Sequence, residues 1–402
     1  MKMNVLFLAK EIPYPPVSGG RMRCWNLLRI LASRHKVVYV CFGRDADPIP
    51  EEMSRIADVI RVSPPVHREG RWWNYFSLLL SFLGKGPRVV GQRRSMCMRR
   101  MAQKAIEERG IDFIFCDSVF YAVNLPRSEI KVVLNEHNLE SKLLERALIY
   151  KKNPVSRFFL NDQLRKFRKY EEETWKAADL VLMCSEVDRK EAARRCPTDA
   201  CFSVTPNGVD VSFFYLPDRG VSETRKIIFT AEMGWYPNVD GVLYFCEHIY
   251  PFIKKEFPDI QFDLVGKNPD PQVKALSGCD PSIRVTGFVE DIRPFVFSSA
   301  VYVVPLRIGS GTRLKILEAM AMGKAIVSTS IGAEGIEVAD GRDIFIADDP
   351  KAFADKVIDL LKNPDRRREM GFNARKLVEQ TYTWDGIGEK LAQDIQDVFQ
   401  GD

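Results

Sequence analysis

Long hydrophobic runs are missing from this sequence. The most apolar patch, 72–83, is short and contains polar residues, whereas a membrane-spanning helix needs about 18 consecutive apolar residues. The first four residues lead straight into the apolar run 5–9, without the apolar stretch and small-residue cleavage site of a secretory signal. We therefore expect a cytoplasmic protein whose first apolar run is a core strand.

Paired cysteines are lacking as well. The nine cysteines are scattered, odd in number and mostly within apolar runs, and no two have the spacing C-x-x-C. This pattern predicts reduced core side chains and argues against a zinc site or a disulfide framework. Asp45 and Asp47 form a D-x-D pair, but two prolines follow and no further ligand set is evident. A surface turn is the expected interpretation, and no metal is predicted.

The composition, 46% apolar and 28% charged over 402 residues, is that of a folded globular chain long enough for two domains. The net charge of +5 is unevenly divided. Residues 1–215 hold 36 basic and 25 acidic side chains, a balance of +11, and the remainder holds 23 and 29, a balance of −6. The basic half favours anionic partners, with an acidic membrane surface and nucleic acid both as candidates.

Short apolar runs alternate with longer amphipathic stretches, which predicts parallel sheets covered by helices. The expected strands of the first half are 5–9, 37–42, 59–62, 113–116, 132–134 and 180–184. Turn residues at 205–210 and a polar stretch at 216–220 place a domain boundary near 212–224. The same alternation of apolar and amphipathic segments then begins again, with strands expected at 227–230, 261–265, 283–285, 301–304, 325–328 and 343–347. The chain is therefore predicted to be α/β, with two successive doubly wound domains and further helices at 366–381 and 384–399.

Two features follow predicted strands of the first domain, where open parallel sheets bind their ligands. The proline-rich loop 13–21 contains Gly19 and Gly20, which let a ligand approach the backbone just before a helix start that suits a phosphate. A plain turn is the alternative. The loop does not match G-x-G-x-x-G, which disfavours a nicotinamide dehydrogenase. His137 lies in a polar loop after 132–134 and is either structural or able to help position a sugar.

The segment 309–321 follows a strand of the second domain and opens a helix. Its glycines, Gly309 and Gly311, permit close approach, and Arg313 with Lys315 supplies positive charge for a diphosphate. Glu318, about one and a half turns into the helix, can accept two hydrogen bonds, as from the hydroxyls of a ribose. The alternative is a solvated amphipathic helix with ordinary charges.

The stretch 68–100 combines aromatic and basic residues and suits the interface of an anionic membrane or a lipid-tailed substrate. A core-facing helix with basic flanks is an equal alternative, and the motifs typical of RNA-binding domains are missing. The residues predicted to form this acceptor or membrane face are Arg68, Trp72, Trp73, Tyr75, Arg93 and Arg94.

Together these segments resemble the bacterial glycosyltransferases of family 4, which have the GT-B architecture of two Rossmann-like domains facing each other across a cleft. The subgroup that the sequence is most similar to makes exopolysaccharides. The motifs that carry the resemblance are 13–20, 135–140 (NEHNLE), 206–210 (PNGVD), 235–240 (WYPNVD), 287–291 (GFVED) and 309–321.

The resemblance implies a retaining enzyme that moves a sugar from a nucleotide-diphosphate sugar, such as a UDP-sugar, to a hydroxyl of a glycan or lipid-linked glycan. It implies an acceptor domain over 1–212, a donor domain over 213–382 and a helix over 383–402 that returns to the first domain. No metal cofactor is implied, because cationic side chains neutralise the diphosphate. A cytoplasmic enzyme peripheral to the membrane, without nucleic acid as a partner, is expected.

The same resemblance implies roles for single residues. Glu318 would bind the ribose, Lys315 the diphosphate, and Val289 the base through its backbone, while His137 would contact the donor sugar. The catalytic set is His137, Lys315 and Glu318. The full donor-binding set is Gly19, Gly20, Val289, Ser310, Gly311, Thr312, Arg313, Lys315 and Glu318.

Two departures from the family pattern keep alternatives open. Ser310 stands where many members have a second glutamate, so the donor sugar cannot be inferred. The loop 233–236 lacks the arginine and lysine that many members have there, and Arg313 with Lys315, or else Lys267 or Arg307, would substitute. A nucleotide-sugar epimerase of the same architecture and a non-catalytic nucleotide-sugar-binding protein are the rival functions.

Overall fold

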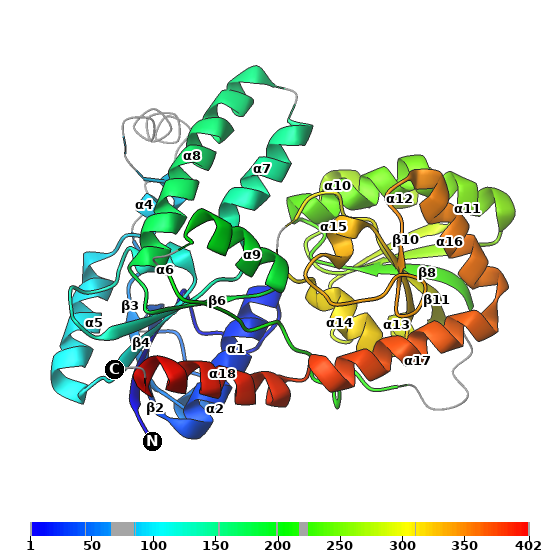
Figure 1. Cartoon of the computed structure of the whole chain (residues 1–402). Coiled ribbons are helices and arrows are strands. Elements are labelled where there is room, and N and C mark those ends of the chain that lie inside the picture. The colour runs from blue at the N-terminus through cyan, green and yellow to red at the C-terminus, as the bar shows by residue number, and fades with distance from the viewer. Residues whose placement is uncertain are drawn as a thin grey trace. The chain divides into compact units, whose positions relative to one another are not determined.

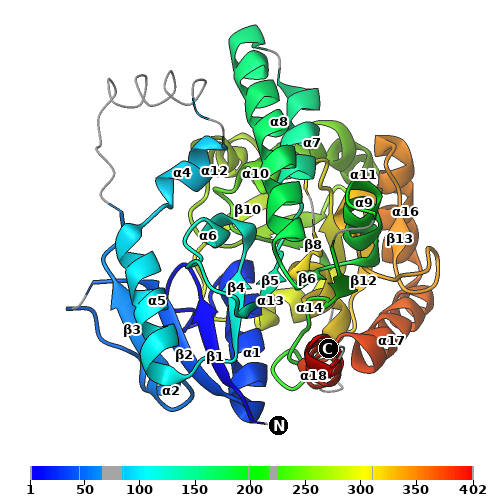
Figure 2. The same cartoon turned by 60° about the vertical axis from the view of Figure 1, so that its left-hand side comes forward.

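The computed structural model describes residues 2–44, 46–65, 84, 86–151, 153–197, 200–216, 224–309 and 311–400. The chain divides into two compact units (Figures 1 and 2). Unit 1 comprises Met1–Pro206 and Gly388–Asp402, and unit 2 comprises Asn207–Ile387. The first division lies close to the predicted boundary at 212, and the second falls within the last helix.

Unit 1 is built on a parallel sheet of seven strands in the order β3-β2-β1-β4-β5-β6-β7. Its strands are β1 (Asn4–Leu8), β2 (Lys36–Phe42), β3 (Asp58–Val62), β4 (Phe113–Asp117), β5 (Lys131–Asn135), β6 (Leu180–Met183) and β7 (Phe202–Val204). Its helices before the C-terminal segment are α1 (Gly19–Arg34), α2 (Glu51–Ser54), α4 (Arg88–Gln92), α5 (Met96–Arg109), α6 (Val119–Ala122), α7 (Glu140–Tyr150), α8 (Pro154–Lys176) and α9 (Glu186–Arg195). β1 is central and apolar because helices cover both faces of the sheet, and Val5 to Leu8 are fully buried.

Unit 2 contains a second parallel sheet, of six strands in the order β10-β9-β8-β11-β12-β13. Its strands are β8 (Thr224–Thr230), β9 (Gln261–Val265), β10 (Ile283–Gly287), β11 (Ser299–Val304), β12 (Ala325–Ser328) and β13 (Phe345–Ile346). Its helices are α10 (Tyr236–Tyr244), η1 (Phe245–Ile249), α11 (Tyr250–Glu256), α12 (Pro271–Cys279), α13 (Arg293–Ser298), α14 (Leu314–Ala321), α15 (Ser330–Ala333), α16 (Pro350–Lys362) and α17 (Pro364–Thr381). The predicted α/β class with two doubly wound parallel sheets is confirmed.

Each sheet reverses its strand order once, and that point determines where a ligand can enter. In unit 1 the chain runs outward from β1 to β3 and then returns to the other side of β1 with β4. In unit 2 it runs outward from β8 to β10 and returns beside β8 with β11. The loops after β1 and β4, and those after β8 and β11, therefore border the two crevices in which side chains can meet a ligand.

The last helix, α18 (Trp384–Gln400), contributes its residues from Gly388 onward to unit 1. Arg34 pairs with Glu389 at 2.6 Å, and Ser203 donates a hydrogen bond to Asp394 at 2.6 Å. Near the end of the helix, the ring of Phe399 packs on Phe113 of β4 with centroids 5.4 Å apart. These contacts join the C-terminal segment to the β4–β7 half of the first sheet and to α1.

Some local expectations differ from the structure. The helical stretch between β8 and β9 is divided into α10, the π-helix η1 and α11. Pro251 at the start of α11 has no N–H to donate to the preceding turn, which accounts for the widened turn before it. The expectation of core cysteines holds for the five that are buried, Cys24, Cys41, Cys116, Cys184 and Cys196, but is wrong for Cys97, Cys201 and Cys279, which are exposed. Within the part of the chain that the structure describes, no helix is long and apolar enough to cross a membrane.

Candidate active site

The crevice of unit 2 places Lys315 of α14 against Asn238 of α10. The Lys315 ammonium donates a hydrogen bond to Asn238 Oδ1 at 2.9 Å and lies 4.1 Å from the centre of the Phe229 ring of β8. Asn238 is almost fully buried, and its amide nitrogen donates to the carbonyl of Glu232 at 2.9 Å. Contacts from α10 and β8 thus hold the cation at the point where the strand order reverses.

Glu318 lies three residues after Lys315 on α14, so both side chains project from the same side of the helix. Both are partly buried. Burial raises the pKa of the Glu318 carboxyl to about 7, although Lys315 opposes the rise. Burial, helped by the nearby Arg313, lowers the pKa of Lys315 to about 7, although Glu318 opposes the fall. A cation and a carboxyl that both titrate near neutrality are poised to respond to a charged ligand.

The loop before α14 brings the other predicted donor-binding residues of unit 2 to the same place. Gly311 has φ +73, a conformation that favours glycine, and its carbonyl accepts a hydrogen bond of 2.6 Å from Arg313. A Cβ on Gly309 would lie 2.0 Å from the Arg313 guanidinium, so the arginine occupies the space that a side chain would need. Thr312 is buried, and its carbonyl accepts a 3.4 Å hydrogen bond from Asn207. Ser310 lies outside the described residues.

The remaining candidates of unit 2 lie at the carboxyl ends of other strands. Val289 follows β10 and packs partly buried against the core. Arg307 follows β11, and its guanidinium forms two hydrogen bonds, of 3.0 and 2.7 Å, with Asp240. Lys267 follows β9, and its nearest carboxylate is that of Glu232 at 3.9 Å.

The crevice of unit 1 contains His137 in a hydrogen-bonded group with Asp117. The Nε2 atom of His137 lies 2.8 Å from Oδ1 of Asp117, and Asn135 donates to the same oxygen at 2.7 Å. Arg23 of α1 in turn donates to Asn135 Oδ1 at 2.6 and 3.1 Å. Burial alone would raise the pKa of Asp117, but His137 and the hydrogen bonds outweigh it and hold that pKa below its usual value. An ionised Asp117 therefore orients the imidazole.

The predicted glycines lie at the beginning of α1 in the same unit. Gly19 and Gly20 are the first two residues of this helix and are exposed. A Cβ on Gly20 would lie 3.8 Å from the Nδ1 atom of His137, so the loop after β1 and the loop after β5 meet here. The structure brings Gly20, His137 and Asp117 together at the carboxyl ends of the strands of the first sheet.

Much of the predicted acceptor or membrane face cannot be placed, because Arg68, Trp72, Trp73 and Tyr75 lie outside the described residues. Arg93 follows α4 and is partly buried, with its guanidinium carbon 4.0 Å from the centre of the Phe120 ring. Arg94 is exposed.

Two residues at these crevices were missed in the sequence. Asp117 is the last residue of a strand that was expected to end at Cys116. A polar residue directly after a buried strand is a sequence signal that could have identified it as a site residue. Asn238 belongs to the WYPNVD motif but received no role, because its partner Lys315 is 77 residues away. Within the described ranges there is no cluster of three or more histidine, cysteine, aspartate or glutamate side chains that could hold a metal ion.

Two family models match consecutive parts of the chain. Residues 17–213 match the model described as Glycosyltransferase Family 4, and residues 224–363 match that described as Glycosyl transferases group 1. The chain belongs to glycosyltransferase family 4. It is therefore a glycosyltransferase that uses a nucleotide sugar, and the resemblance seen in the sequence is confirmed.

Similar proteins come from several bacteria. An uncharacterized 44.6 kDa protein in the cps region of Klebsiella pneumoniae is 23% identical over 393 residues, which cover 94% of this family 4 chain and 96% of the relative. The α-maltose-1-phosphate synthase of Mycolicibacterium smegmatis is 27% identical over 54% of this chain and 62% of its own length.

Solved structures support the fold. Sucrose-phosphate synthase from Thermosynechococcus elongatus has a TM-score of 0.74 at 16% identity and covers 100% of both chains. Anabaena HepE in complex with UDP has a TM-score of 0.69 at 16% identity, covering 99% of this chain and 100% of its own. These likenesses agree with a GT-B-like fold for the glycosyltransferase.

Proposed function

We propose that this glycosyltransferase transfers a sugar, with retention of configuration, from a nucleotide-diphosphate sugar to a hydroxyl of a glycan or lipid-linked glycan in polysaccharide biosynthesis. The observation that carries the donor half of the proposal is the placement of Lys315, held by Asn238, and Glu318 three residues apart on α14 in the crevice of unit 2. The cps-region location of the Klebsiella relative supports the polysaccharide half. We place the enzyme in the cytoplasm, at the membrane face where lipid-linked acceptors are found.

In this proposal Lys315 and Arg313 face the diphosphate, and Glu318 accepts hydrogen bonds from the ribose hydroxyls. The base lies against the backbone at Val289. When the bond between the sugar and the diphosphate breaks, negative charge grows on the leaving oxygen, and the ammonium of Lys315 stabilises it. Binding of that charge also favours the protonated lysine over the neutral form that burial promotes.

The unit 1 crevice supplies the donor-sugar contact in the same proposal. Gly19 and Gly20 present the start of α1 to the far side of the diphosphate, and His137 contacts the sugar. Since Asp117 accepts a hydrogen bond from Nε2, the Nδ1 side of the imidazole, which lies toward Gly20, is the one we assign to the ligand. The acceptor hydroxyl attacks on the face from which the diphosphate leaves, and the leaving phosphate takes its proton.

Nucleotide binding tests the donor half. UDP, GDP and ADP are titrated by calorimetry with and without Mg²⁺, using the wild-type protein and Glu318→Ala. We expect one nucleotide to bind without metal and the variant to lose that binding. Failure of every nucleotide to bind would refute the donor site.

Turnover tests the role of the cation. With the matching donor and an authentic acceptor, Lys315→Ala should lower turnover by on the order of a hundredfold. Lys254→Ala is a matched control, because Lys254 of α11 pairs with Asp280 at the end of α12 and belongs to no proposed site. Full turnover by Lys315→Ala would refute the diphosphate assignment. Sugar rearrangement without any acceptor would indicate the epimerase instead, and donor binding without transfer or hydrolysis would indicate a binding protein.

A further inference from the structure

The end of the α7–α8 hairpin is an apolar surface that the unit 1 core does not cover. The first two turns of α8, 154–161, contain no fully buried residue, and the hairpin extends beyond the sheet in both views (Figures 1 and 2). We call the described residues 146–151 and 153–161 the hairpin tip. Three of its large apolar side chains are mostly exposed, namely Ile149 (69%), Val155 (75%) and Phe158 (69%). Clustered exposure of this kind marks an interaction surface.

The tip is an ordered structure. Asn153 caps α8 by accepting hydrogen bonds from the backbone of Val155 and Ser156 at 2.9 and 3.1 Å. Arg157 donates to the carbonyls of Leu148 and Lys151 at 3.3 and 3.2 Å and so ties the end of α7 to the beginning of α8. Val155 and Phe158, three residues apart, share one face of the helix. Side-chain hydrogen bonds therefore join the ends of the two helices that carry the exposed apolar residues.

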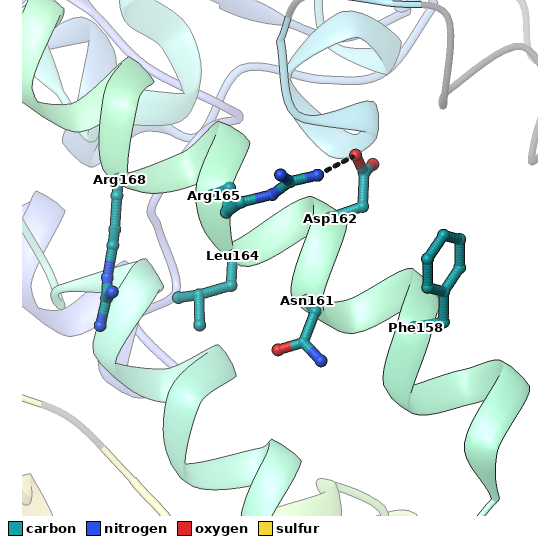
Figure 3. Close-up of a pocket in the computed structure, with 6 residues that line it drawn as sticks. All are labelled: Phe158, Asn161, Asp162, Leu164, Arg165 and Arg168. Atoms are coloured by element: carbon teal, nitrogen blue, oxygen red, sulfur yellow. Dashed lines mark ion pairs between the residues drawn. The ribbon is translucent and has the colours of Figure 1, made fainter.

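Basic side chains predominate around the tip. Between residues 146 and 161 the sequence has four basic residues and no acidic one, and the flanking carboxylates, Glu145 and Asp162, each pair with an arginine. One turn below the tip, α8 carries a shallow depression (Figure 3). It is lined by Phe158, Asn161, Asp162, Leu164, Arg165 and Arg168. Arg165 reaches toward Asp162, at 3.7 Å, and remains 82% exposed, so most of its guanidinium faces solvent.

From this combination we propose that the hairpin tip inserts Ile149, Val155 and Phe158 into the interface of an anionic lipid bilayer, with the surrounding cations on the lipid phosphates. Apolar side chains ringed by lysine and arginine are typical of surfaces that bind the headgroup region. A second copy of the chain is a poorer occupant, because a symmetric contact would bring the same positive charges together. The inference does not depend on the proposed donor site and differs from the sequence-predicted face at 68–100.

Vesicle co-sedimentation with the full-length protein tests this surface. We expect binding to phosphatidylglycerol vesicles, weak binding to phosphatidylcholine vesicles, and release at high salt. The triple variant Ile149→Ser, Val155→Ser and Phe158→Ser should weaken binding about tenfold or more, because three side chains lose their apolar burial. The double variant Arg165→Glu/Lys151→Glu should weaken binding to the anionic vesicles and leave binding to phosphatidylcholine vesicles unchanged.

Controls keep the outcomes distinct. Phe372→Ser removes an equally exposed aromatic residue (67%) of α17 and should bind vesicles like the wild type. Thermal unfolding checks that each variant is folded. We expect the triple variant and Phe372→Ser to fold, because the substituted side chains are exposed. Unchanged binding by a folded triple variant would overturn the proposal. The proposal would also be overturned if only the double variant Trp72→Ala/Trp73→Ala lost vesicle binding. A dimer in solution that the triple variant converts to a monomer would overturn it as well.

Discussion

The paired titration of Lys315 and Glu318 predicts an unusual pH dependence of donor binding. Both groups have a pKa of about 7 in the ligand-free protein. The diphosphate requires protonated Lys315, so affinity is full below pH about 7 and falls as the pH rises. Ribose hydroxyls require ionised Glu318, so affinity falls as the pH drops below about 7. We therefore expect the affinity for a nucleotide sugar to be greatest near neutrality.

The size of each decline follows from the fraction of protein in the competent protonation state. Binding requires protonated Lys315 and ionised Glu318 together, so with both pKa values at about 7 about a quarter of the protein is competent at pH 7 and about one hundredth at pH 9, and affinity should fall about 25-fold over that interval. The same arithmetic gives a decline of about 25-fold between pH 7 and pH 5, where Glu318 is protonated. A lysine with its ordinary pKa near 10.4 would leave affinity almost unchanged up to pH 9.

Calorimetry in buffers of different ionisation heat measures the protons exchanged on binding. The ligand is the nucleotide-diphosphate sugar of the base that binds, because its phosphates do not titrate between pH 5 and pH 9. Binding should take up about 0.8 proton net at pH 8, chiefly through Lys315, and release about 0.8 proton net at pH 6, chiefly through Glu318. Lys315→Met should abolish the uptake, Glu318→Gln should abolish the release, and the control Lys254→Met should change neither. Flat affinity from pH 5 to pH 9, or uptake that persists in Lys315→Met, would refute the reasoning.

Three further predictions concern other contacts. Asn238→Leu removes the acceptor from the Lys315 ammonium and should weaken nucleotide-sugar affinity at pH 7 about tenfold or more, as measured by calorimetry. Asp117→Asn should lower turnover about tenfold while donor affinity changes little, because a neutral amide holds the imidazole less firmly. Gly371→Ala should lower the free energy of unfolding in urea by about 1–3 kcal/mol, because its Cβ would lie 1.9 Å from the carbonyl oxygen of Gly323.

Conservative variants separate these effects from general damage. Asn238→Asp keeps an acceptor for the ammonium and should retain affinity, so equal losses in both Asn238 variants would count against the positioning role. Normal turnover in Asp117→Asn would show that the ionised carboxylate is dispensable. Phe372 follows Gly371 in the sequence but is exposed on α17, so Phe372→Ala should leave the unfolding midpoint nearly unchanged.

Sequence periodicity located most of the strands, because those of a parallel sheet covered on both faces must be apolar along their whole length. β7 was missed, since it is only three residues long and none of them is fully buried. Pattern signals grow with the length of an element, so short elements at sheet edges and in connections are the ones that escape.

By itself the sequence determined the family, the α/β class, the restart of the strand rhythm, and the placement of Lys315, Glu318 and His137 after strands. The tertiary structure alone decided which polar groups meet them, as with Asp117 at His137 and Asn238 at Lys315. It also decided that Ile149, Val155 and Phe158 lie exposed together on a hairpin tip. The physical reason is that strand order and helix docking bring distant segments side by side, and neither is encoded in the local spacing of residues.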